Sequence, residues 1–240
     1  MKTERNKLYV NEYFESISGE GITAGKPCWF LRLSGCNLSC RYCDTPHHNK
    51  YKVYQIDDLV AIFYDYISES YKRGIKMLII TGGEPLLQRD ALGRFIDSLQ
   101  HTLIMNDITD FQVRIETNGT QPRLDRKYFS FERYSMDFKL PSAFSDLNEW
   151  EKYADLAMKN IETLIPWSNE GDEVKMVVDP DNNKDIDAMR YFFDSSDWDR
   201  VSIQPVWGKD MSKLVSRLRD EKFFGQLLFR GQLHKIFGWR

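Results

Sequence analysis

Short apolar runs typical of buried strands alternate along this chain with longer segments whose apolar residues recur at helical spacing. The run at residues 77–80, for example, is followed by Leu92, Phe95, Ile96 and Leu99, which share one face of a helix. Strands that alternate with helices predict βαβ units and a mainly parallel sheet in an α/β fold. We expect strands at residues 29–33, 77–80, 111–115, 134–138, 174–178, 201–203 and 227–229.

The clearest helix is predicted at residues 56–71, with Asp57 or Asp58 as its N-cap. A second is expected to begin near Lys184, after a turn that caps it. No repeat, low-complexity segment or flexible linker divides the chain, and 240 residues suffice for one sizeable core. We therefore predict a single domain over residues 1–240. In a barrel or partial barrel, functional groups gather at the C-terminal ends of the strands.

The charge balance argues against a nucleic-acid partner. With 33 Lys and Arg against 36 Asp and Glu, the formal net charge is -3, so no basic excess is present to neutralise phosphates. The apolar runs are too short to span a membrane, and the first ten residues lack the apolar core of a signal peptide. These features lead us to expect a cytoplasmic protein with no membrane partner.

Three cysteines, Cys36, Cys40 and Cys43, follow the pattern C-x3-C-x2-C. In a reducing cytosol such a group more often holds metal than disulfides. Three thiolates on a short loop can bind three irons of a [4Fe–4S] cluster and leave the fourth iron open to a small molecule. A zinc site completed by His47 or His48 remains an alternative, because zinc normally takes four ligands. Cys28 lies in an apolar run and is interpreted as a buried small hydrophobe.

Three further motifs each stand at the end of a predicted strand: TGGEP at residues 81–85, IETNGT at 115–120 and DFKLPS at 137–142. The glycines allow a ligand to approach the backbone closely. Glu116 and Asn118 are suited to ribose hydroxyls, and Lys139 to a carboxylate. Each motif taken alone could equally be a turn or a surface ion pair. Their order after the cysteine loop is what favours a shared binding site.

Together these motifs resemble the radical S-adenosylmethionine superfamily. From NEYFESISGEG near the start to QLHKIFGWR at the end, the chain more narrowly resembles the 7-carboxy-7-deazaguanine synthase family. The resemblance implies a modified partial (β/α) barrel, a homodimer, a [4Fe–4S] cluster, S-adenosylmethionine and Mg²⁺. It also implies reduction by a flavodoxin- or ferredoxin-type electron donor.

The resemblance assigns roles to individual positions. Cys36, Cys40 and Cys43 would ligate the cluster, and Thr45 would ligate Mg²⁺. Contacts to S-adenosylmethionine would come from Tyr42, Asp44, Gly83, Glu84, Glu116, Asn118, Asp137, Phe138, Lys139 and Gln204. The substrate would meet Ile17, Ser18, Gly19, Thr81 and Arg240, together with Glu20, Arg32 and His234 as catalytic candidates. Two positions depart from the family pattern: Ser18 replaces a usual Gln, and Asp137-Phe138 replaces the Ser-Pro of some members.

The implied substrate is 6-carboxy-5,6,7,8-tetrahydropterin. A deoxyadenosyl radical would remove its C6 hydrogen, and the ring would contract to 7-carboxy-7-deazaguanine with loss of ammonia, in deazapurine (queuosine precursor) biosynthesis. An alternative is an activase of glycyl-radical enzymes, such as anaerobic ribonucleotide reductase, which shares a similar cysteine loop but acts on a protein. A non-catalytic zinc-binding protein is a second alternative.

Overall fold

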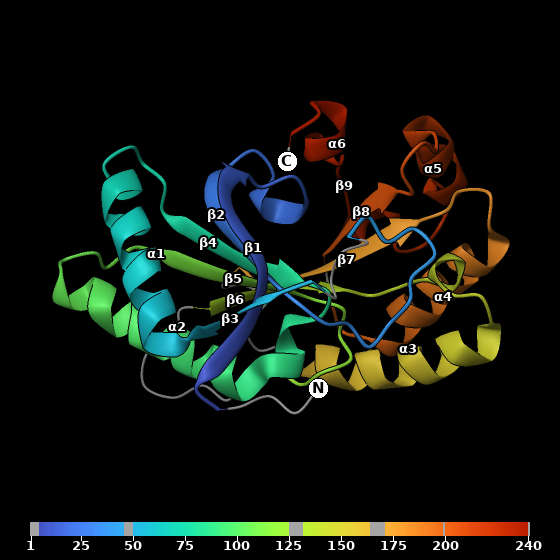
Figure 1. Ribbon diagram of the computed structural model, residues 1–240. Coiled ribbons are helices and arrows are strands. Elements are labelled where there is room, and N and C mark those ends of the chain that lie inside the picture. Colours follow the sequence, from blue (N-terminus) through green and yellow to red (C-terminus); the bar gives the residue numbers. More distant parts are fainter. Residues whose placement is uncertain (1–4, 46–49, 125–131, 164–170, 199, 240) are drawn as a thin grey trace.

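The computed structural model describes residues 5–45, 50–124, 132–163, 171–198 and 200–239. In these residues nine strands form one sheet in the order β3-β1-β2-β4-β5-β6-β7-β8-β9 (Figure 1). From β2 to β9 in this order, each strand pairs in parallel with the next. Strand β1 pairs antiparallel with both β2 and β3. Because β3 and β9 are separate edges of this order, the sheet is an open, partial barrel, as predicted. The strands are β1 (Lys7–Ile17), β2 (Pro27–Leu33), β3 (Lys52–Gln55), β4 (Met77–Gly82), β5 (Gln112–Thr117), β6 (Glu132–Asp137), β7 (Glu173–Val178), β8 (Val201–Pro205) and β9 (Leu227–Phe229).

Every strand predicted from the sequence is present, with ends shifted by three residues or fewer, but β1 and β3 were missed. Strand β1 carries polar residues among its apolar ones, and most of its positions are only partly buried. Such a strand lacks the continuous apolar run that marks a buried parallel strand.

The first five described helices each lie between two strands along the chain and cover one side of the sheet, whereas the sixth follows β9 and lies on the other side (Figure 1). The helices are α1 (Ile56–Tyr71), α2 (Arg89–Met105), α3 (Leu147–Glu162), α4 (Asn183–Ser195), α5 (Met211–Leu218) and α6 (Leu233–Ile236). Short 3₁₀ turns form η1 (Gly21–Thr23), η2 (Pro85–Gln88), η3 (Pro141–Ala143) and η5 (Phe224–Gln226). No helix in the described ranges is both long enough and apolar enough to cross a membrane.

The helix ends correct one prediction and support another. Helix α1 has the predicted bounds, but its N-cap is Gln55. The N-cap assignment to Asp57 or Asp58 was wrong, since both lie in the first turn of the helix. Their carboxylates there interact favourably with the positive end of the helix dipole. Helix α4 begins at Asn183, next to the predicted Lys184, and the Asn182 side chain accepts from the Lys184 backbone N–H.

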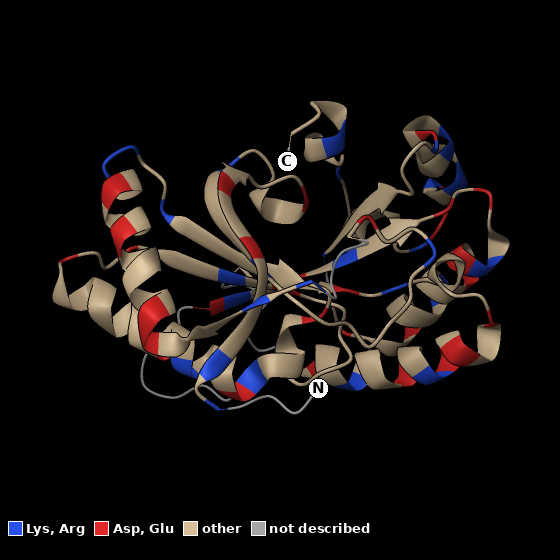
Figure 2. Ribbon diagram, viewed as in Figure 1, with Lys and Arg blue, Asp and Glu red and all other residues tan. Residues whose placement is uncertain are grey.

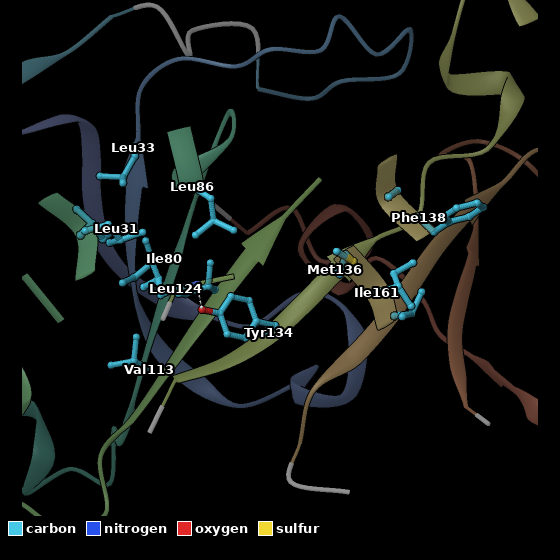
Figure 3. Packing of buried hydrophobic residues seen from close by; sticks show 14 of the residues in the cluster. Leu31, Leu33, Ile80, Leu86, Val113, Leu124, Tyr134, Met136, Phe138 and Ile161 are labelled. Atoms are coloured by element: carbon cyan, nitrogen blue, oxygen red, sulfur yellow. Dashed lines mark hydrogen bonds between the residues drawn. The ribbon is translucent and has the colours of Figure 1, made fainter. Parts of the chain in front are cut away.

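Alternate residues of each parallel strand face opposite sides of the sheet. Leu31, Ile80, Val113 and Met136 belong to the apolar core between sheet and helices (Figure 3). Burying one such side chain contributes about 1.5–3 kcal/mol, so this layer supplies much of the driving force for folding. The opposite face carries polar and charged residues, and Figure 2 shows charged positions on the central strands as well as on the helices. This polar inner face forms the site described next.

Candidate active site

A cavity of about 660 Å³ opens at the C-terminal ends of the parallel strands. It takes in the cysteine loop after β2, the loop between β1 and η1, and the C-terminal segment around α6. Most of the predicted site residues line it: Ile17, Gly19, Glu20, Arg32, Cys36, Cys40, Tyr42, Cys43, Asp44, Thr45, Thr81, Gly83, Glu116, Asn118, Asp137, Lys139 and His234. The motifs that the sequence placed at strand ends therefore meet in one place.

Four predicted site residues do not line the cavity. The Ser18 hydroxyl is buried and lies 2.8 Å from Oγ1 of Thr23. Phe138 packs in the apolar core, and Glu84 is buried beneath the cavity floor. Gln204 is also buried, and neither of its amide atoms has a hydrogen-bond partner among the described residues. The predictions for Arg240, and for His47 and His48 as zinc ligands, concern positions outside the described residues.

The three clustered cysteines all face the cavity, whereas Cys28 does not. Burial raises the pKa of the thiols of Cys36 and Cys40 above the ordinary value. Burial also raises the pKa of Cys28 to about 12, in keeping with its interpretation as a buried hydrophobe. Within the described residues, no three His, Cys, Asp or Glu side chains converge closely enough to hold a single metal ion. Three thiols spread around one cavity form a donor set that fits a multi-iron cluster.

The GGE loop packs directly on the cysteine loop. The Glu84 backbone N–H donates to the Gly35 carbonyl over 2.8 Å. A Cβ on Gly83 would lie 2.6 Å from Cβ of Cys36 and 2.7 Å from the Gly35 carbonyl carbon, both too close for any side chain. Glycine at this position is therefore required for the two loops to meet, and the exposed backbone beside the cysteines can approach a ligand.

Glu84 holds the end of β5 against this loop. Its carboxylate accepts from the backbone N–H groups of Leu86 (2.9 Å) and Asn118 (2.7 Å) and from the Thr117 hydroxyl. Burial raises the pKa of Glu84 to about 7 in spite of these donors. The side chain predicted to contact the cofactor thus acts as a buried connection between β4 and β5.

The side-chain amide of Asn118 is oriented by its neighbours. Its Oδ1 accepts from the backbone N–H of Thr120 over 3.0 Å, a group that can only donate, so Nδ2 must point the other way. Nδ2 donates to Oδ1 of Asn37 (3.1 Å) and to Sγ of Cys36 (3.8 Å). Both amide hydrogens are therefore directed at the cysteine loop.

Four charged side chains of alternating sign form a row across the cavity, which we call the charge chain: Glu20, Lys175, Asp137 and Lys139. The Lys175 ammonium lies 2.7 Å from Oε2 of Glu20 and 3.3 Å from Oδ1 of Asp137. Oδ2 of Asp137 accepts from the Lys139 ammonium over 2.8 Å. Burial opposes the charge on both lysines, but the carboxylates around them raise their pKa well above the ordinary value.

Two further ion pairs border the cavity. Arg32 donates through Nε to Glu12 (3.0 Å) and through Nη1 to Oγ1 of Thr45 (3.2 Å). Asp44 lies 2.9 Å from the Lys235 ammonium and 3.7 Å from Nε2 of His234. The His234 imidazole and the Lys235 ammonium hold the pKa of Asp44 well below its usual range, although burial opposes them.

Sequence reasoning missed several lining residues, namely Asn11, Glu12, Phe14, Lys175, Trp207, Gln232, Lys235 and Trp239. Lys175 did leave a signal, because it interrupts the apolar run EVKMVV of a predicted buried strand. A lysine there must either face a polar interior or be paired. The other residues lie on β1, after β8 or in the C-terminal segment around α6, where no local pattern distinguishes a lining residue from an exposed one.

Comparison with known proteins agrees with this site. Residues 31–165 match the model of the Radical SAM superfamily. A 7-carboxy-7-deazaguanine synthase of Methanospirillum hungatei is 32% identical over 234 residues, covering 96% of this chain and 86% of the relative. The synthases of Clostridium acetobutylicum (32% identical; 95% and 94% covered) and Thermoplasma acidophilum (31%; 95% and 96%) match similarly.

The fold is also shared with a solved structure. The crystal structure of QueE from Escherichia coli aligns with a TM-score of 0.59 and 21% identity, covering 94% of each chain. The matching superfamily and the relatives that span nearly the whole chain confirm the resemblance drawn from the motifs. The chain therefore belongs to the radical S-adenosylmethionine superfamily and, within it, to the 7-carboxy-7-deazaguanine synthase family.

Proposed function

We propose that this enzyme converts 6-carboxy-5,6,7,8-tetrahydropterin to 7-carboxy-7-deazaguanine with loss of ammonia, in deazapurine (queuosine precursor) biosynthesis. One observation carries the proposal: Glu20, Arg32 and His234, from three distant parts of the chain, line the same cavity as the three clustered cysteines. The name shared by the relatives supports it as well. A glycyl-radical activase would need no enclosed pocket for a small carboxylated molecule, so these observations favour the synthase.

Radical SAM enzymes carry a [4Fe–4S] cluster and use S-adenosylmethionine, which together supply a 5′-deoxyadenosyl radical when bound. Cys36, Cys40 and Cys43 would hold the cluster. The backbone at Gly83 would lie against the amino-acid part of S-adenosylmethionine, because no side chain intervenes there. The Lys139 ammonium is suited to the carboxylate of that ligand and Glu116 to its ribose. The other predicted contacts that line the cavity, Tyr42, Asp44, Asn118 and Asp137, stand as part of this proposal.

Arg32 and Thr45 would bind the carboxylate end of the substrate. A guanidinium matches a carboxylate with two parallel hydrogen bonds, and Arg32 already lies within hydrogen-bond distance of the Thr45 hydroxyl. We propose that this hydroxyl is also a ligand of Mg²⁺. That ion prefers oxygen donors and usually keeps several non-protein ligands. The Thr45 hydroxyl and the substrate carboxylate that Arg32 would hold beside it are oxygen donors that fit this preference.

The other end of the substrate would meet Glu20 and His234. The pterin ring presents N–H groups, which an ionised carboxylate accepts well. Burial alone would raise the pKa of Glu20, but the Lys175 ammonium and the Gln232 amide lower it to about 2. At neutral pH Glu20 is therefore an acceptor, and not a proton donor.

Several wider statements belong to the same proposal. The enzyme would take electrons from a flavodoxin- or ferredoxin-type donor, work as a homodimer in the cytoplasm and form a single domain over residues 1–240. Ile17, Gly19 and Thr81, which line the cavity, and Arg240 are proposed as further substrate contacts.

The proposal is tested with anaerobically reconstituted protein, dithionite, S-adenosylmethionine, Mg²⁺ and the carboxylated pterin, using mass spectrometry to detect product. We expect 7-carboxy-7-deazaguanine from wild type and from Cys28→Ala, and none from Cys40→Ala. Cys28→Ala is the matched control, because that cysteine is buried away from the cavity. Accumulation of 5′-deoxyadenosine without this product would disprove the substrate assignment and favour the activase.

A further inference from the structure

Lys175 is the member of the charge chain to which the motifs assign no role. It lies on β7 between apolar residues, and its side chain is 5% exposed. Burying an ammonium costs free energy unless the charge is paired, so the partners of Lys175 indicate its role. Those partners are Glu20 on the loop after β1 and Asp137 at the end of β6.

The geometry leaves Glu20 little freedom. Its Oε2 accepts from Lys175 over 2.7 Å, and its Oε1 accepts from Nε2 of Gln232 over 2.8 Å. Asp137, held in turn by Lys139, restrains Lys175 from its other side. Among the described residues, each carboxylate oxygen of Glu20 thus has one donor and retains lone pairs for a ligand in the cavity.

The loop that carries Glu20 is anchored by the same strand. Two residues before Lys175, Glu173 accepts from the backbone N–H of Ile22 over 2.9 Å and pairs with Arg114. Because residues two apart on a strand face the same side, Glu173 and Lys175 hold this loop at two neighbouring points. Strand β7 therefore fixes the position of this loop, in addition to forming part of the sheet.

We propose that Lys175 is a positioning residue: it orients the Glu20 carboxylate so that this carboxylate, as an anion, accepts the N–H groups of the substrate ring. The inference rests on the proposed function, since it takes the substrate to be the N–H-rich pterin. The geometry gives Lys175 this role through Glu20, and not through direct contact with the reacting atoms.

The charges around Glu20 make the inference testable by pH. Lys175 on β7 and His234 from the C-terminal segment favour the ionised carboxylate, with Gln232 as a neutral donor. Glu116 on β5 and Asp137 on β6 are the negative groups that face Lys175. Without the ammonium, burial and these negative groups would favour protonated Glu20, which cannot accept N–H groups as an anion.

The experiment measures the dissociation constant of the carboxylated pterin by anaerobic calorimetry on holoenzyme with S-adenosylmethionine, between pH 5 and pH 8. We expect Lys175→Met to bind roughly tenfold or more weakly at low pH, since a hydrogen bond to a charged group is lost. The ratio of its dissociation constant to that of wild type should fall as pH rises, because Glu20 then ionises. Lys175→Arg keeps the charge and should keep that ratio constant with pH.

A double-mutant cycle with Glu20→Gln separates positioning from a general structural role. If Lys175 acts through Glu20, the double variant should bind no more than about threefold more weakly than Glu20→Gln alone. Fully additive losses, or a Lys175→Met ratio that does not vary with pH, would overturn the inference. Lys76→Met, which removes an exposed lysine paired with Asp110, controls for the substitution and should bind as wild type does.

A failure of the proposed function would be recognised separately. If wild type neither binds nor converts the pterin, the substrate assignment fails, and a crystal structure of Lys175→Met holoenzyme then decides the inference. Rotation of the Glu20 carboxylate away from its place between β7 and Gln232 would support positioning. An unmoved carboxylate would refute it. If wild type converts the pterin but the cycle is additive, only the role of Lys175 is wrong.

Discussion

Gly19 lies directly against the imidazole of His234, so closely that a Cβ on Gly19 would fall 2.9 Å from Cγ of the ring and nearer still to Nδ1. The backbone confirms the contact, because the Leu233 N–H donates to the Gly19 carbonyl over 2.9 Å. The loop after β1 and the C-terminal segment, more than two hundred residues apart, are thus fitted to each other where both border the cavity.

From this contact we predict that Gly19→Ala displaces His234 and lowers kcat/KM roughly tenfold or more, as expected when a substrate-positioning group moves by about 1 Å. Steady-state product formation measures the loss. Gly225→Ala is the matched control, because a Cβ there meets no atom within 4 Å in the part of the chain that the structure describes. Wild-type kinetics for Gly19→Ala would show that the ring of His234 is not needed in this position.

Gly83→Ala is predicted to impair cluster assembly and not only turnover. The added Cβ would meet the Gly35 carbonyl and Cβ of Cys36, which are backbone or near-backbone atoms that cannot move away freely. The expected result is iron and sulfide content well below that of wild type after identical reconstitution, with a weaker EPR signal of the reduced cluster. Gly225→Ala again serves as the control. A full cluster in Gly83→Ala would contradict the packing of these two loops.

Glu84 should give the protein a characteristic pH dependence of stability. Its pKa is raised from 4.5 to about 7, so between these values the folded protein binds more protons than the unfolded chain. The free energy of unfolding therefore falls as pH rises through this window, by about 3 kcal/mol for a shift of this size. Glu84→Gln should lack this slope. Denaturant unfolding at pH 4.5, 6 and 7.5 compares the two, and parallel pH profiles would contradict the prediction.

Asn118→Leu is predicted to lower the midpoint potential of the cluster. The amide of Asn118 donates to Sγ of Cys36, and such hydrogen bonds to cluster sulfurs stabilise the reduced, more negative state. An EPR-monitored redox titration without S-adenosylmethionine measures the potential, so that any effect on that ligand is excluded. Asn106→Leu, an exposed position after α2, should match wild type. An unchanged potential in Asn118→Leu would show that this contact has no electronic effect.

The local spacing of three cysteines indicated the cluster loop, and the strand-end position of the GGE, ETNGT and DFKLPS motifs indicated that they share one site. The first prediction depends on spacing within a few residues, and the second on the shared direction of parallel strands. Both can be read directly from the order of residues in the sequence. The side-chain directions of Glu84 and Phe138 could not be read in this way. Each lies within a correctly placed motif, but alternation along the chain turns its side chain away from the cavity.

The sequence by itself determined the alternating strands and helices, the parallel sheet and the three-thiol loop, because apolar periodicity and short-range spacing suffice for these. Only the tertiary structure decided that Lys175 pairs with Glu20 and Asp137, and that Gln232 reaches Glu20 across 212 positions of the chain. The physical reason is that an ion pair in a cavity depends on where distant backbone segments come to lie. That placement follows from packing the whole sheet, and no local pattern encodes it.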